Sequence, residues 1–324
     1  MSTQLIEMNI SGSQALAYGA AQAGVNLVTG YPGSPVTAAF EAFEKLADDP
    51  RRTFWAINEK SAADLALGVS LAGGRALLCV KSPGFNVALD TLMVANLAPG
   101  DGGLVILAGD DPGGWGSQSE EDTRPLVQAL EIPMLEPPTV QAAYSLMTQA
   151  FDLSEKFNLP VVVRVIHALT VDTGVISVPA QLPHPHQPAP FARKKDRWTV
   201  LPVQVVPLHR QLQQKMCAAA GELTGWEQLQ QTGTMRRGVI AAGYAWSKLH
   251  RVLQSGADLS LPVLGLEVLN PLAAEHISEF LIGLDEVLVI EETAPMIETA
   301  VRSIAQQNCR SEERRVGKEC RSRW

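Results

Sequence analysis

The chain has 324 residues, and 46% of them are hydrophobic, which is ample for two buried cores and suggests two domains. Lysine and arginine number 26 against 34 aspartates and glutamates, a net charge of -8. This acidic balance lacks the positive footprint that nucleic acid or an anionic membrane surface requires, so those partners are disfavoured.

No apolar run approaches the roughly 18 to 20 residues that cross a bilayer, and residues 1–13 lack the basic and apolar regions of a signal peptide. We therefore expect a cytoplasmic protein. Four cysteines, Cys79, Cys217, Cys309 and Cys320, include no C-x-x-C pair. They predict neither a disulfide framework nor a metal or cluster site in this chain.

Short apolar runs alternate with Ala-rich stretches from about residue 10 to 170, which is typical of βα units around a mainly parallel sheet. The expected strands are 27–30, 53–57, 76–80, 103–108, 133–135 and 160–166. The expected helices have apolar residues at three- and four-residue spacing and are 11–23, 36–47, 59–71, 86–97 and 140–156. This pattern predicts an α/β fold.

Residues 177–208 contain seven prolines and break the regular pattern, which predicts an extended inter-domain connection that we assign to 177–236. A second, smaller α/β unit is expected over 237–309. Its expected strands are 238–242, 262–266 and 286–290, and its expected helices are 244–253, 273–282 and 296–306.

Residues 310–324, RSEERRVGKECRSRW, switch abruptly to a basic composition. They resemble the in-frame translation of a widely used sequencing adapter, so we exclude them from the fold prediction as an artefact. We expect the authentic protein to continue beyond Cys309 into sequence not present here.

Four loops are predicted after the first four strands: 30–35, 58–60, 81–86 and 109–118. In a parallel sheet these loops gather at one edge, where ligands of such sheets usually bind. Their Gly, Ser, Glu, Asn and Asp residues suggest a site, although each loop taken alone is equally typical of a plain turn.

The chain has no G-x-x-x-x-G-K-[ST] phosphate loop, no G-x-G-x-x-G fingerprint, no H-E-x-x-H zinc motif and no G-x-S-x-G nucleophile elbow. Its six histidines are isolated or lie in the Pro-rich connection. Hydrolytic triad chemistry is therefore not supported.

Glu59 begins the predicted helix 59–71. From spacing alone, the favoured interpretation is a first-turn carboxylate that stabilises the helix dipole, a role that requires no catalysis. Trp115, between glycines, either stacks on a cofactor or anchors its loop.

An acidic group follows the fourth strand. Asp110 and Asp111 precede Pro112, and either close a turn or form a divalent metal site with the neighbouring carboxylates Glu120, Glu121 and Asp122. We favour a solvated acidic loop and predict no metal ligands.

Several motifs together resemble one family. GYPGSP, NEKSAADLALGVSLAGGRALLCVKSPGFNVALDTLM, GGLVILAGDDP, SQSEEDTR, IPMLEP and LSEKFNLPVVVR are similar to the pyrimidine-binding domain of the 2-oxoacid:ferredoxin oxidoreductases. The likeness is greatest to the large subunits of the indolepyruvate branch and is dense over residues 10–170. Residues 237–307, with EVLVIEETAPMIE, resemble that family's transketolase C-terminal-like domain more loosely.

The resemblance implies a thiamine diphosphate-binding fold, with 1–176 as the pyrimidine-binding domain. It also implies that Glu59 hydrogen-bonds N1′ of the cofactor's aminopyrimidine. Sharing a proton there favours the tautomer whose 4′ nitrogen removes the thiazolium C2 proton, which is acid-base work by a positioned carboxyl.

The family's Y-P-x-[ST]-P turn implies further contacts. Ser34 is the substrate-facing hydroxyl, where serine replaces the threonine usual in the indolepyruvate branch, and it joins Glu59 as a catalytic residue. Tyr31 and Gly33 shape the turn and, with Asn86, bind the cofactor. By the same carry-over, the residues that line the substrate pocket are Asp110, Asp111 and Gln118.

The implied reaction is oxidative decarboxylation of a 2-oxoacid, indolepyruvate or another arylpyruvate, to an acyl-CoA, with electrons passing to ferredoxin. Mg²⁺ and [4Fe-4S] clusters would bind through regions beyond Cys309, so we expect this fragment alone to be inactive. A smaller second subunit and an oligomeric complete enzyme are also implied.

Two other functions remain open. A non-oxidative thiamine diphosphate-dependent decarboxylase would use a similar glutamate without clusters, and C-x-x-C-x-x-C runs in the uninterrupted gene would separate the two. A catalytically silent subunit would use the α/β fold as a scaffold only, since a fold alone does not establish activity.

Overall fold

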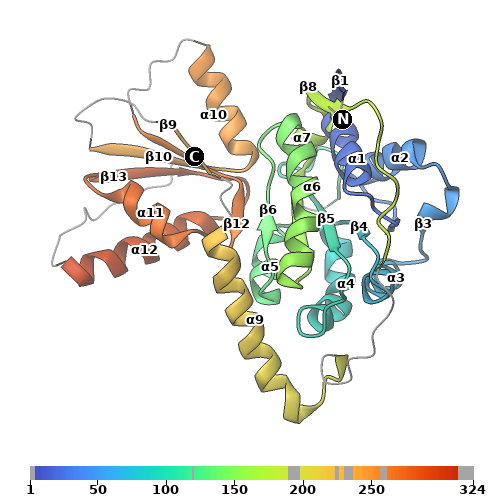
Figure 1. Cartoon of the computed structure of the whole chain (residues 1–324). Coiled ribbons are helices and arrows are strands. Elements are labelled where there is room, and N and C mark those ends of the chain that lie inside the picture. The colour runs from blue at the N-terminus through green and yellow to red at the C-terminus, as the bar shows by residue number, and fades with distance from the viewer. Residues whose placement is uncertain are drawn as a thin grey trace.

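The computed structural model describes residues 4–118, 120–188, 198–222, 226–229, 236–255 and 261–312. They form a larger α/β unit and a smaller one beside it, with the long helix α9 (Pro202–Glu222) at their border (Figure 1). Residues 313–324, most of the predicted adapter-derived tail, lie outside the described residues. No helix among the described residues is long and apolar enough to span a membrane.

Seven strands make up the large sheet. Their order is β12 (Val268–Asn270), β6 (Met134–Leu135), β7 (Val161–Ile166), β5 (Leu104–Asp110), β4 (Ala76–Lys81), β2 (Leu27–Gly30) and β3 (Thr53–Trp55). All neighbours are parallel except β12, which pairs antiparallel with β6. The six predicted strands and their parallel arrangement are confirmed, whereas β12 was not predicted.

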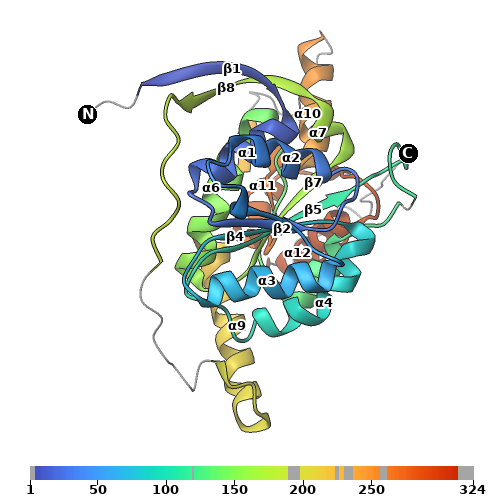
Figure 2. The same cartoon turned by 90° about the vertical axis from the view of Figure 1, so that its right-hand side faces the viewer.

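Helices cover both faces of this sheet (Figure 2). One core lies under α1 (Gly12–Gln22), α2 (Thr37–Leu46) and α6 (Val140–Phe157). The other lies under α3 (Glu59–Leu71), α4 (Ser82–Ala95) and α5 (Arg124–Leu130). Side chains at the helix starts satisfy backbone donors: Ser11 forms a capping box with Gln14, and Asn58 accepts from the amide of Ser61 at 2.8 Å.

The start of α4 differs from the prediction. Residues 82–86 were expected to belong to a loop, but they are the first five residues of a helix that begins at Ser82. The Ser-Pro-Gly sequence resembles a turn. However, a proline in the first turn of a helix loses no intrahelical hydrogen bond and has a compatible backbone angle. Loop 81–86 is therefore the entry to a helix.

The prediction that residues 177–208 form an extended connection is wrong at both ends of that segment. Its first residues complete β8 (Thr173–Pro179), which forms an antiparallel ribbon with β1 (Leu5–Ser11). The segment from Pro202 begins α9, where a proline is tolerated, and Pro207 lies inside that helix. Residues 189–197 of the connection lie outside the described residues. The short helix α7 (His167–Val171) leads from β7 into the ribbon.

The smaller unit has a four-stranded sheet in the order β13 (Glu286–Ile290), β10 (Arg237–Ala242), β11 (Val263–Leu266) and β9 (Trp226–Leu229). Only β9 runs antiparallel to its neighbour. Apolar residues of α10 (Tyr244–Gln254) pack on one face, and those of α11 (Ala274–Leu281) and α12 (Met296–Glu312) pack on the other. The predicted strands and helices of this unit are confirmed.

Candidate functional site

The four predicted loops meet at the carboxyl edge of the large sheet. They follow the adjacent parallel strands β2, β3, β4 and β5. A Cβ on Gly33 would lie 2.7 Å from Cδ of Lys81, and one on Gly109 would lie 2.7 Å from Cδ of Pro35. The convergence predicted from the sequence is therefore confirmed by direct contacts between the loops.

Glu59 is the first residue of α3 and is partly exposed. Its side chain lies against the buried Gly84 at the start of α4. A Cβ on Gly84 would lie 2.5 Å from Oε1 and 2.7 Å from Cγ of Glu59. Only a residue without a side chain leaves this space, so the first turns of α3 and α4 together hold the carboxylate at the sheet edge.

Ser34 lies in the turn after β2, where the hydroxyl of Thr37 fixes the backbone. The amide of Gly33 donates to Oγ1 of Thr37 at 2.7 Å, and that hydroxyl donates to the Gly33 carbonyl at 3.0 Å. A Cβ on Gly116 would lie 3.0 Å from Oγ of Ser34, so the loop after β5 reaches over the serine. Tyr31 is 40% exposed.

Asn86 links α4 to the segment that follows the loop 109–118, because its Nδ2 donates to Oε2 of Glu121 at 3.1 Å. Gln118 is exposed, and Trp115 is 81% exposed. Trp115 therefore does not anchor its loop by burial. The roles assigned to Asn86 and Gln118 stay predictions.

Asp111 shapes the loop after β5. Its Oδ2 accepts from the amides of Gly116 and Ser117, both at 2.6 Å, and the amide of Gly113 donates to Oε1 of Glu120 at 2.8 Å. These contacts correspond to the turn-closing role considered for Asp111. They do not support a substrate contact, although the loop they shape covers Ser34.

Asp110 is fully buried and faces a guanidinium. Nε of Arg164 donates to its Oδ2 at 2.6 Å, and the same oxygen accepts from the amide and hydroxyl of Thr123, each at 3.1 Å. Nη1 of Arg164 donates to Oε2 of Glu136 at 2.5 Å. Burial alone would lower the pKa of Arg164, but the charges of Glu136 and Asp110 outweigh it and raise that pKa. These contacts do not support a pocket role for Asp110.

A second buried arginine links this edge to the smaller unit. Arg124 donates from Nη2 to Oδ2 of Asp122 at 2.7 Å and from Nη1 to Oε2 of Glu291 at 2.6 Å. Glu291 in turn accepts from the first amides of α12, including that of Ile297 at 2.9 Å. The carbonyl of Ala294 also accepts from Arg124, at 2.8 Å. The position of the smaller unit is therefore tied to the end of the loop that covers Ser34.

Sequence reasoning did not assign these arginines a role. The available signal was Arg164 itself, a lone charge inside the apolar run of β7, VVVRVI. Such a residue requires buried partners. Within the described part of the chain, no group of three or more His, Cys, Asp or Glu side chains is placed to hold a metal ion.

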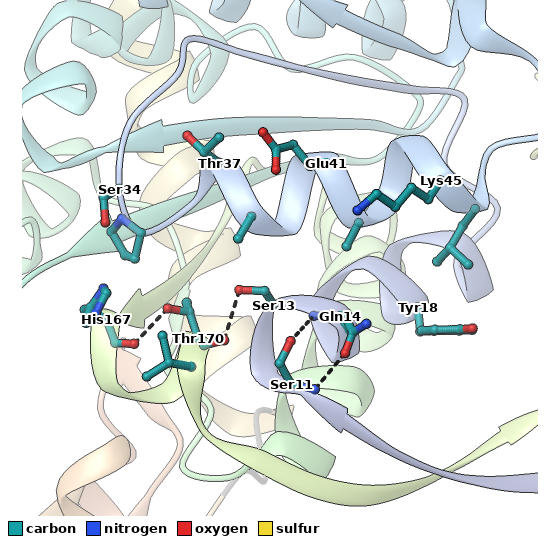
Figure 3. A pocket seen from close by; sticks show the side chains of 15 residues that line it. Ser11, Ser13, Gln14, Tyr18, Ser34, Thr37, Glu41, Lys45, His167 and Thr170 are labelled. Atoms are coloured by element: carbon teal, nitrogen blue, oxygen red, sulfur yellow. Dashed lines mark hydrogen bonds between the residues drawn. The ribbon is translucent and has the colours of Figure 1, made fainter. Parts of the chain in front are cut away.

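A cavity of about 800 Å³ opens beside Ser34, between α1 and α2 (Figure 3). Ser34 and His167 lie at one end of it and Lys45 lies toward the other. Ser34 alone among the predicted site residues lines this cavity. His167 was noted in the sequence only as an isolated histidine.

The family model described as "Pyruvate flavodoxin/ferredoxin oxidoreductase, thiamine diP-bdg" matches residues 18–182. The chain belongs to this family. The matched region is its thiamine diphosphate-binding part and contains all four loops of the sheet edge. The resemblance found in the motifs is therefore confirmed.

Curated proteins similar to this chain are named as indolepyruvate oxidoreductase subunits. The chain is 31% identical to indolepyruvate oxidoreductase subunit IorA of Methanothermobacter thermautotrophicus over 298 residues, which is 91% of this chain and 48% of the relative. It is 32% identical to the IorA subunit of Archaeoglobus fulgidus over 302 residues, 90% of this chain and 48% of the relative. The chain thus spans about half the length of the curated relatives it matches.

Among solved structures, 2-oxoglutarate:ferredoxin oxidoreductase from Magnetococcus marinus matches with a TM-score of 0.74 at 16% identity. The match covers 92% of this chain and 60% of that one. At this identity the likeness establishes the fold, and it extends over both α/β units.

The sheet edge fits the aminopyrimidine contact of thiamine diphosphate. The space above Gly84 lets the Glu59 carboxylate lie across the first turn of α4, and Glu59 keeps part of its surface open to a ligand. A carboxyl is the group needed to share a proton with a ring nitrogen.

Proposed function

We propose that this chain is part of a thiamine diphosphate-dependent 2-oxoacid:ferredoxin oxidoreductase that converts indolepyruvate or another arylpyruvate to an acyl-CoA. The observation that carries the proposal is Glu59, held over Gly84 at the edge of a family-matched thiamine diphosphate-binding domain. The two IorA relatives, each matched over about 90% of this chain, support the indolepyruvate branch.

Glu59 is assigned to the cofactor and Ser34 to the substrate. Thiamine diphosphate, when bound, supplies the carbon nucleophile that adds to a keto group. Glu59 holds a proton shared with the aminopyrimidine nitrogen and orients that ring. Ser34 donates its hydroxyl to the 2-oxoacid, and the Gly116 backbone lies beside that hydroxyl. Tyr31, Gly33 and Asn86 complete the proposed cofactor contacts.

The complete enzyme needs more than this chain. We propose that 1–176 is the pyrimidine-binding domain, 177–236 the connection and 237–309 a transketolase C-terminal-like domain. Mg²⁺, the [4Fe-4S] clusters, the coenzyme A site and the contact with ferredoxin then belong to further regions and to a smaller second subunit. We also propose an oligomeric, cytoplasmic enzyme.

The test uses the full-length protein with its partner subunit. Glu59→Gln keeps the size of the side chain but removes the ionisable carboxyl that shares a proton with the ring nitrogen. Cofactor binding should therefore persist while thiazolium C2 proton exchange, followed by NMR in D₂O, falls at least about a hundredfold. Glu44→Gln, at an exposed position of α2, is the matched control and should exchange at the wild-type rate.

Two outcomes would contradict the proposal. Unchanged exchange in Glu59→Gln would remove the role of Glu59. Failure of the wild-type enzyme to reduce ferredoxin with any arylpyruvate, despite turnover of the acid to an aldehyde, would replace the oxidoreductase with a decarboxylase.

A further inference from the structure

The cavity beside Ser34 has two unlike sides. Along α2, Ala38, Ala42 and Leu46 follow one another at four-residue spacing and form an apolar stripe that continues from Pro35. The same helix also lines the cavity with polar and charged residues beside this stripe: Thr37, Glu41 and Lys45. Across the cavity, α1 presents mainly polar groups, among them Gln14 (Figure 3). At about 800 Å³ the space is of the size that holds a drug-sized organic molecule.

Most of the polar groups at the Ser34 end already bond within the protein. The hydroxyl of Ser13 donates to the Thr170 carbonyl at 3.0 Å, and that of Thr170 donates to the His167 carbonyl at 2.7 Å. Thr37 is engaged with Gly33. These groups shape the wall and are satisfied without a ligand.

His167 is different, because no described residue bonds its buried Nδ1. No described residue therefore fixes the tautomer through Nδ1, and the other ring nitrogen can act as donor to an anion. Both side chains lie beside Gly116, since a Cβ there would be 3.5 Å from Cε1 of His167 and 3.0 Å from Oγ of Ser34. Ser34 and His167 thus form a polar end next to the apolar stripe.

We propose that this cavity binds the aromatic side chain of the 2-oxoacid against Ala38 and Ala42, with Ser34 and His167 binding its carboxylate end. The proposal rests on the proposed function and deepens it by naming the residues that select an aryl substrate. Alanines at these two positions leave room for a flat ring, which larger side chains would fill. His167 is then a second substrate-binding residue beside Ser34.

Binding is measured first, on the purified chain, with two stable carboxylic acids. Indole-3-propionate carries the ring and propionate lacks it, and saturation-transfer NMR reports each. We expect the ring-bearing acid to bind at least tenfold more tightly, because only it buries aromatic surface. Equal binding of the two acids, or no binding of indole-3-propionate, would overturn the proposal.

Variants then locate the ring. Ala42→Phe fills the cavity and should weaken indole-3-propionate binding about tenfold or more, and Ala38→Phe, at a more exposed position, should do the same with less risk to folding. Ala218→Phe, at an exposed position of α9, is the matched control and should bind like wild type. Unchanged affinity in both folded cavity variants would place the ring elsewhere.

Two further variants fix the orientation of the ligand. His167→Ala should weaken indole-3-propionate binding about tenfold, as expected for a lost hydrogen bond to a charged group. Lys45→Gln, at the opposite end, should leave it unchanged. If Lys45→Gln lost binding and His167→Ala did not, the carboxylate would lie at the Lys45 end of the cavity. Its assignment to Ser34 and His167 would then be overturned.

Full-length enzyme separates this inference from the proposed function. Ala42→Phe should raise KM for an arylpyruvate by a larger factor than it raises KM for pyruvate. If wild type oxidises no 2-oxoacid, the proposed function fails. If wild type is active and Ala42→Phe changes neither KM, only the cavity assignment fails.

Discussion

Removal of the Arg164 side chain should strongly destabilise the protein. It is fully buried between the carboxylates of Asp110 and Glu136, at 2.6 and 2.5 Å. Arg164→Met keeps much of the volume but removes the charge, and so leaves two buried carboxylates without their cation. We expect a folded but strongly destabilised protein.

The magnitude follows from the burial of all three groups. Breaking a buried ion pair by removing one partner costs about 3–5 kcal/mol, and two orphaned carboxylates place Arg164→Met at the upper end. A loss of this size is a third or more of the roughly 5–15 kcal/mol that stabilises a folded protein. With a slope of about 3 kcal/mol per molar urea, the midpoint should fall by about 1–2 M.

Urea unfolding followed by circular dichroism measures the shift. Arg51→Met removes an exposed arginine that pairs with Asp49, and this matched control should unfold like wild type. A triple variant, Arg164→Met with Asp110→Asn and Glu136→Gln, should recover part of the loss because it removes the unpaired charges. A wild-type midpoint for Arg164→Met, or no recovery in the triple variant, would refute the reasoning.

Three shorter predictions follow. Gly84→Ala pushes a methyl into the proposed cofactor glutamate, so it should abolish cofactor binding by the full-length enzyme and lower the free energy of unfolding by about 1–3 kcal/mol. Gly68→Ala, with nothing within 4 Å, should instead stabilise its helix by about 0.5–1 kcal/mol in thermal unfolding. Burial would raise the pKa of Asp122, but its bonded arginine holds that pKa below the usual 3.8. The stability that the Asp122 carboxylate contributes should therefore be present above about pH 4 and be lost as the pH falls through the lowered pKa of the folded protein. The higher urea midpoint of wild type over Asp122→Asn should then vanish in acid. Burial raises the pKa of the Cys79 thiol, so iodoacetamide should label exposed Cys217 in the native protein and spare Cys79, as peptide mass spectrometry would detect.

Local patterns predicted most of the regular structure. The strand 27–30 and the helix 59–71 were predicted with the residue limits that the structure has. Errors arose where prolines suggested a break, at α4 and α9, and where a short alternating pattern was not used. The pattern LIEMNIS alternates polar and apolar residues and forms β1, but its partner β8 lies more than 160 residues away in the chain.

The candidate site was predictable only in part. The order of the motifs matched Glu59 and Ser34 to positions in a known family. Such a match depends only on residue types and their spacing, which the sequence contains. Neither the space above Gly84 nor the cavity lined by Ser34 and His167 could be predicted that way. Both depend on how segments from different βα units approach one another.

By itself, the amino-acid sequence determined the α/β class, the parallel sheet and the family. Hydrophobic periodicity and local motifs act over a few residues and need no knowledge of the fold. Only the tertiary structure decided that Asp110 faces Arg164, that β12 of the smaller unit extends the large sheet, and that His167 lies beside Ser34. A buried charge takes whichever partner the packing brings within bonding distance, and that partner can lie anywhere in the chain.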